Sequence, residues 1–109
     1  MNVKELAENV GLEEEEFSDL MELFVKTSAS NLTDLARAIE TGNAEEVVKY
    51  SHSLKGAAGN LGFKEIYNSS KLIEINARQG ILEGSKESVT SLREKLTLIE
   101  EDLKKISER

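Results

Sequence analysis

The segment VTSLREKLTLIEEDLKKI, residues 89–106, carries the pattern that decides the fold. Its apolar residues are spaced alternately three and four apart, at Val89, Leu92, Leu96, Ile99, Leu103 and Ile106. This spacing places them on one face of an α-helix, as in helices that pack side by side in a bundle. We therefore predict a long helix that begins after Gly84, with Ser85 as its cap, and continues almost to Arg109.

Glycines divide the preceding chain into further helical segments. A short amphipathic segment over residues 3–10 ends at Gly11. The acidic run 13–16 then opens a long helix, since carboxylates favour the first turn, and Gly42 closes it. Residues at spacings of three and four predict its core-facing side: Phe17, Leu20, Met21, Phe24, Ser28, Leu32, Leu35 and Ile39.

Two more helices complete the pattern. Asn43 followed by Glu46 predicts an N-cap, so that the third helix runs from Ala44 to about Leu61 and ends at Gly62. A fourth helix is predicted over residues 64–79, before Gly80. We expect an all-α fold: a single domain over residues 1–109, forming an up-and-down antiparallel four-helix bundle with a short extra N-terminal helix.

Composition excludes several classes of function. The chain of 109 residues has no cysteine, so disulfides, thiolate metal sites and thiol nucleophiles are excluded. No stretch approaches the roughly 20 apolar residues of a membrane span, and the N-terminus lacks a signal-peptide core, so we expect a cytoplasmic protein without membrane association. The net charge of −7 argues against a nucleic-acid partner.

His52 is the single histidine, and it lies in the predicted third helix within HSLKGAAGNLG, residues 52–62. At about 100° per residue, His52 points almost opposite to the arc that we expect to face the core. That arc comprises Val47, Tyr50, Leu54, Ala57, Ala58 and Leu61. Gly59 lies about 20° from the histidine on the helical wheel, Gly56 about 40° and Lys55 about 60°. We expect an exposed imidazole over bare backbone, flanked by an ammonium group, with room for another molecule to approach.

Each of these features has a plainer interpretation. A lone surface histidine is usually without function, and either glycine alone is explained by helix packing. Glu74 alone reads as a solvated residue paired with Lys71 or Arg78. A metal site is disfavoured because one histidine has no second ligand nearby, and haem is disfavoured because neither methionine fits as an axial ligand. The coincidence of histidine, lysine and two glycines on one face favours a functional site.

The run 52–62 closely resembles the signature of histidine-containing phosphotransfer (HPt) domains, and the resemblance extends over most of the chain because that family is also a helical bundle. It implies that His52 is phosphorylated, that Lys55 neutralises phosphoryl oxygens and that Gly56 lets a receiver domain approach. It further implies that Glu74, 22 positions after the histidine, hydrogen-bonds the ring. A carboxylate that accepts from Nδ1–H leaves the Nε2 lone pair free to attack phosphorus.

The resemblance implies a stoichiometric phosphocarrier, not an enzyme, since the sequence has no ATP-binding loop. Its partners are then response-regulator receiver domains or a hybrid histidine kinase. It needs no cofactor or metal of its own, because Mg²⁺ belongs to the receiver. We expect docking to involve Val48, Lys49, Gly56, Gly59 and Asn60. We also expect a free-standing monomer, with a module excised from a larger hybrid kinase as the alternative. The alternative to the phosphocarrier function is an adaptor bundle that binds a receiver or kinase without accepting phosphate.

Overall fold

The computed structural model describes residues 2–107, apart from the side chains of residues 106 and 107. This part of the chain forms five helices and no strand. Their bounds are Val3–Asn9 for α1, Glu14–Glu40 for α2, Ala44–Leu61 for α3, Lys64–Arg78 for α4 and Ser85–Ser107 for α5. The predicted all-α bundle is confirmed; the bounds of α3 agree with the prediction, and the other described boundaries differ from it by at most two residues.

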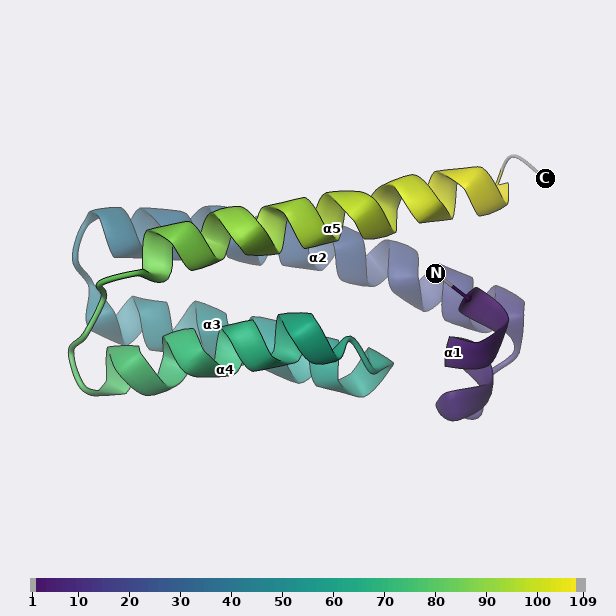
Figure 1. Cartoon of the computed structure of the whole chain (residues 1–109), viewed down its shortest axis with the longest axis horizontal. Coiled ribbons are helices and arrows are strands. Elements are labelled where there is room, and N and C mark those ends of the chain that lie inside the picture. Colours follow the sequence, from purple (N-terminus) through teal and green to yellow (C-terminus); the bar gives the residue numbers. More distant parts are fainter. Residues whose placement is uncertain (1, 108–109) are drawn as a thin grey trace.

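The four long helices run alternately up and down, and consecutive helices are antiparallel (Figure 1). Helix α2 packs against both α3 and α5, while α4 packs most closely against α3. Helix α1 lies across the end of the bundle against α2 (Figure 1). With 27 and 23 residues, α2 and α5 extend past α3 and α4, which have 18 and 15.

Local signals at the helix ends explain why the segments begin and stop where they do. The Asn43 side chain accepts a hydrogen bond from the backbone N–H of Glu46 at 3.1 Å, as its position in the sequence predicted. Gly62 ends α3 in the left-handed conformation, with φ of +79°, which a residue without a Cβ adopts readily. Ser85 was predicted to precede the last helix, but it is the first residue of α5 and is buried.

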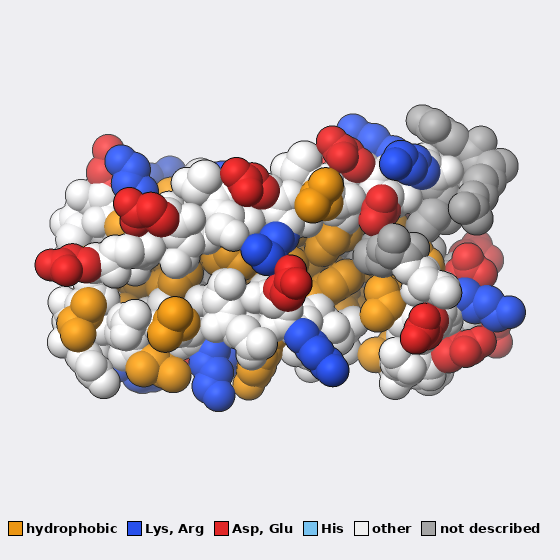
Figure 2. All heavy atoms as spheres, in the orientation of Figure 1, with side chains coloured by type: hydrophobic (Ala, Val, Ile, Leu, Met, Phe, Trp, Pro, Cys, Tyr) orange, Lys and Arg blue, Asp and Glu red, His pale blue; other side chains and the backbone are white. Residues whose placement is uncertain are grey.

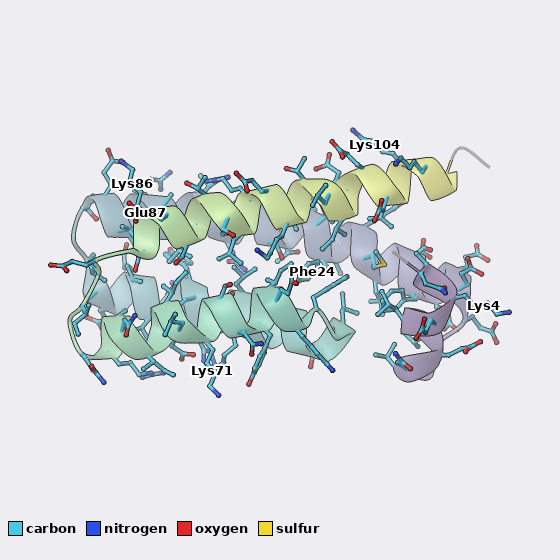
Figure 3. All side chains as sticks on the ribbon, in the orientation of Figure 1. Lys4, Phe24, Lys71, Lys86, Glu87 and Lys104 are labelled. Atoms are coloured by element: carbon cyan, nitrogen blue, oxygen red, sulfur yellow. The ribbon has the colours of Figure 1, made fainter. Side chains whose placement is uncertain are left out.

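The core follows the predicted stripes with a few corrections. Buried side chains come from every long helix and include Phe17, Met21, Leu32, Leu35, Val47, Leu54, Ile73 and Leu92. Phe24 stacks on Phe63 at 5.1 Å between ring centroids, where α3 turns into α4, and Figure 3 shows Phe24 in the bundle interior. Tyr50, Ala57 and Ile39 are only partly buried at its margin. The core position predicted for Ile106 lies outside the described side chains.

Leu20 is the clear exception, because it was predicted to face the core but is 40% exposed. The Phe24–Phe63 stack marks the end of α3, so residues of α2 that precede Phe24 lie beyond that helix. Leu20 lies at the edge of the apolar stripe, whereas Phe17 and Met21 at its centre are fully buried. Within residues 2–107, no helix combines the length and the apolar character that crossing a membrane requires.

Two glycine substitutions with opposite expected signs test this account of the helix ends. Gly62→Ala should lower the free energy of unfolding by about 1–2 kcal/mol, because a left-handed backbone strains a residue with a Cβ. Gly56→Ala should raise it by about 1 kcal/mol, because Gly56 lies inside a helix and an added Cβ meets nothing within 4 Å. Urea denaturation followed by circular dichroism measures both free energies of unfolding. Changes of the same sign for the two variants would contradict the different roles given to Gly62 and Gly56.

Candidate functional site

His52 lies in the middle of α3 and points away from the core. Its side chain is 62% exposed, whereas its neighbours Ser51 and Leu54 are buried. The backbone of α3 thus turns its apolar side inward and leaves the imidazole in solvent, as the helical wheel predicted.

Glu74 of α4 is brought to the ring by the antiparallel packing of α3 and α4. The two residues are 22 positions apart, and Nδ1 of His52 lies 2.8 Å from Oε2 of Glu74. The Glu74 side chain is only 4% exposed, so this is a buried carboxylate at the foot of an exposed imidazole. The solvated interpretation of Glu74 is therefore wrong.

Two cations share the same carboxylate. Nζ of Lys55 lies 2.7 Å from Oε1 of Glu74, and Nη2 of Arg78 donates to Oε2 at 2.8 Å. Lys55, 23% exposed, therefore forms an ion pair with Glu74, although we predicted it as a cation beside the imidazole that neutralises phosphoryl oxygens. Arg78 was considered only as a partner in the plainer interpretation of Glu74, and its position four residues along the same helix was the signal that pointed to it.

Burial and hydrogen bonding act on Glu74 in opposite directions. Burial alone raises the pKa of a carboxyl, but the hydrogen bonds from Lys55, Arg78 and His52, together with the charge of Lys55, outweigh it. The pKa of Glu74 is lowered from 4.5 to about 2. Glu74 is therefore ionised at every pH at which the bundle is expected to function.

The ionised carboxylate fixes the proton of the neutral imidazole. A carboxylate only accepts hydrogen bonds, so the contact of 2.8 Å requires that Nδ1 carries the proton and donates it to Oε2. Nε2 then keeps its lone pair, and among the described residues it has no hydrogen-bond partner. The arrangement presents a nucleophilic nitrogen to solvent.

The two glycines near His52 differ in their surroundings. A Cβ added at Gly56 meets nothing within 4 Å, so the surface there is open. A Cβ added at Gly59 lies 3.2 Å from Cδ2 of Tyr67, a side chain of α4. We predicted that Gly59 leaves room for another molecule to approach, and this needs correction. The Tyr67 ring occupies the space beside Gly59, so this glycine serves the packing of α3 against α4.

The other predicted docking residues lie on α3 around the histidine. Val48 is half-buried and lines a shallow hollow of about 410 Å³ with Ala44, Glu45, Ala77 and Arg78. Lys49 is exposed, with Nζ 5.2 Å from the centre of the Tyr50 ring, and Asn60 is exposed. The side chain of Lys71 on α4 points away from the bundle (Figure 3). Residues 2–107 hold no cluster of three or more metal-binding side chains.

Comparison with known proteins bears on these features. The family described as Hpt domain matches residues 19–106. The chain belongs to the Hpt domain family. A solved structure, that of histidine-containing phosphotransfer protein B (HptB) from Pseudomonas aeruginosa PAO1, is similar at 26% sequence identity, with a TM-score of 0.84. The match covers 95% of this chain and 90% of that one.

No curated protein matches the sequence significantly. Hpt domains are phosphocarrier modules that interact with receiver domains and kinases in phosphorelays, and the chain is accordingly assigned to phosphotransfer in two-component signalling.

The lowered pKa of Glu74 predicts a specific loss of stability in acid. The pKa of the Glu74 carboxyl is 4.5 in the unfolded chain and about 2 in the folded one. Its contribution to the free energy of unfolding is therefore complete above pH 4.5 and disappears as the pH falls to about 2. Over this pH interval the free energy of unfolding of the wild type should fall by about 3 kcal/mol more than that of Glu74→Gln. Urea denaturation at several pH values measures the difference.

Glu65→Gln is the matched control for this experiment, because Glu65 is an exposed glutamate on the same helix. It should keep the acid sensitivity of the wild type. Equal acid sensitivity of Glu74→Gln and the wild type would show that the carboxylate is not held as described.

Proposed function

We propose that this Hpt domain carries a phosphoryl group on Nε2 of His52, received from a phosphoaspartate of one receiver domain or from a kinase and passed to the aspartate of another receiver. The observation that carries the proposal is the hydrogen bond of 2.8 Å between Nδ1 of His52 and Glu74, which in the neutral imidazole places the lone pair on Nε2 of an exposed ring.

The transfer step requires little covalent chemistry from the bundle. The Nε2 lone pair forms a bond to phosphorus while the bond from phosphorus to the aspartate oxygen breaks, and the aspartate leaves as a carboxylate. The Nδ1 proton stays on the ring and keeps its hydrogen bond to Glu74, which stabilises the positive charge that develops on the imidazole. Transfer to a second receiver is the same step in reverse.

Electrostatics around the ring support this role. Lys55 and Arg78 each contact a different oxygen of Glu74, so two positive charges flank one negative charge beneath the imidazole. The surplus of one positive charge favours an incoming phosphoryl group. Phosphoryl transfer also needs Mg²⁺ and an acidic pocket, which we assign to the receiver, so that the bundle works without a metal or cofactor of its own.

Docking of the receiver centres on α3. Gly56 provides open backbone one turn from His52, and Val48 one turn in the other direction presents a partly exposed apolar side chain. Lys49 and Asn60 add polar contacts around this area. We assign the chain to the cytoplasm, where receiver domains are found, and we assign it no kinase activity.

Phosphorylation assays test the proposal directly. Incubation with a phosphorylated receiver should label the wild-type protein with phosphate that is labile in acid and stable in base, as a phosphoramidate is. His52→Gln should remove the label, because it removes the only imidazole in the chain. Ser53→Ala, which removes an exposed hydroxyl beside the histidine, should keep it and is the control against serine phosphorylation.

Either of two results would contradict the proposal. Label that persists in His52→Gln would place the phosphate elsewhere. A wild type that binds several phosphorylated receivers without ever becoming labelled would instead support the adaptor function.

Substitution of Gly56 tests whether a partner approaches closely at that point. Gly56→Leu should keep the circular dichroism spectrum of the wild type, since the site is open, but it should slow transfer by about a hundredfold because the side chain holds the receiver away from Nε2. Gly56→Ala, the smaller control, should retain much more activity. Normal single-turnover rates for Gly56→Leu would rule out close approach at this position.

A further inference from the structure

The carboxylate of Glu74 has more positive partners than it needs. Among the side chains that the structure describes, Glu74 is the only ionisable one that is buried. Figure 2 shows the usual arrangement on one face of the bundle, where acidic and basic side chains lie at the surface. One hydrogen bond from Nδ1 of His52 fixes the tautomer, and one cation balances one carboxylate. The second cation therefore calls for an explanation.

Lys55 is the cation that belongs to the same helix as the histidine. It follows His52 by three residues on α3, so the two side chains lie on one surface of that helix. Nδ1 of His52 and Nζ of Lys55 contact the two oxygens of the same carboxylate, which places the ammonium beside the ring. An ammonium is a point charge on a flexible chain, so it can turn from one acceptor to another.

Arg78 is the cation that belongs to the same helix as the carboxylate. It follows Glu74 by four residues on α4, and its Nη2 donates to Oε2, the oxygen that also accepts from Nδ1 of His52. A guanidinium presents its N–H groups as a planar fork that matches both oxygens of a carboxylate. In this structure Lys55 occupies the other oxygen, Oε1. The Arg78 side chain is 60% exposed, so it has room for the small shift that would bring the fork onto both oxygens.

A phosphoryl group on Nε2 changes the balance of charge at this site. It adds about two negative charges, and Glu74 contributes one more. The phosphorylated ring with its Nδ1 proton, Lys55 and Arg78 contribute one positive charge each, so the phosphorylated site is neutral only with both cations present. Without Arg78, a move of Lys55 to the phosphoryl group would leave a buried carboxylate without a cation, which is strongly unfavourable.

We propose that Arg78 is a positioning residue that releases Lys55 for phosphoryl transfer. When His52 is phosphorylated, Lys55 turns from Oε1 of Glu74 to the phosphoryl oxygens, and Arg78 binds both carboxylate oxygens in its place. The inference rests on the proposed function and adds an exchange of ion pairs at the same site. Arg78 does not touch the phosphoryl group in this arrangement, since it acts through Glu74 and Lys55.

The unphosphorylated protein provides the first test, because it shows whether one cation can replace the other. Lys55→Gln and Arg78→Gln should each raise the equilibrium constant for unfolding by about tenfold or less, since the remaining cation still pairs Glu74. The double variant should raise it about tenfold more than the product of the two single effects. Urea denaturation at about pH 7 measures all three.

Arg93→Gln is the matched control, because Arg93 is an exposed arginine on α5. Its combination with Lys55→Gln should give only the product of the single effects. The same simple product for Lys55→Gln with Arg78→Gln would show that the two cations do not replace each other, and it would overturn the inference.

Single-turnover transfer from a phosphorylated receiver provides the second test. Arg78→Gln should lower the rate constant by about tenfold, because Lys55 then stays on the carboxylate. Adding Glu74→Gln should make transfer about fivefold faster than in Arg78→Gln alone, because a glutamine has no charge to hold Lys55 and its carbonyl still accepts from Nδ1–H. Further addition of Lys55→Gln should remove this recovery, and Arg93→Gln alone should transfer at the rate of the wild type.

Nitrogen-15 NMR of the single imidazole separates an effect on Lys55 from an effect on the ring. The neutral ring should carry its proton on Nδ1 in the wild type, in Arg78→Gln and in Arg78→Gln with Glu74→Gln. A proton that moves to Nε2 in Arg78→Gln would overturn the inference, because Arg78 would then act by setting the tautomer.

The outcomes distinguish the inference from the proposed function. A wild type that never accepts phosphate would overturn the proposed function, and the inference with it. A wild type that transfers phosphate, with no recovery when Glu74→Gln is added to Arg78→Gln, would overturn the inference alone. That second result is expected if Arg78 contacts the phosphoryl group itself.

Discussion

The buried carboxylate of Glu74 is the interaction on which the organisation of the site depends. A charge with 4% exposure is unfavourable unless it is paired, and three donors from two helices pair it here: His52 and Lys55 from α3, and Arg78 from its own helix. The same contacts that keep the carboxylate ionised also set the proton on Nδ1 and connect α3 to α4. The contacts of Glu74 therefore both orient the nucleophilic imidazole and hold α3 against α4.

Glycine has three different roles within seven residues of α3. Gly56 leaves an open surface near His52, Gly59 makes room for the Tyr67 ring, and Gly62 ends the helix with a backbone conformation that strains other residues. In the interior of a helix each glycine costs about 1 kcal/mol relative to alanine. At Gly59 this cost is offset by close packing against Tyr67, whereas Gly56 has no such contact, which is why we connect only Gly56 with the approach of a partner.

The unequal lengths of the helices give the two ends of the bundle different properties. Around His52 all four long helices are present and the core is closed. Beyond the α3–α4 turn only α2 and α5 continue, and α1 covers part of the space against α2. Leu20 and Leu98 are both exposed, and Leu98 borders the groove between α5, the start of α4 and α1.

The amino-acid sequence by itself determined the helices, their ends and most of the core, because apolar spacing, caps and glycines act within a few residues of one another. It also determined that His52 points outward, and the resemblance to HPt domains singled out Glu74. Only the tertiary structure decided that Glu74 is buried with Lys55 on one oxygen, that Tyr67 fills the space at Gly59 and that Leu98 borders an open groove. These features depend on the register and relative lengths of helices distant in sequence, which local periodicity does not specify.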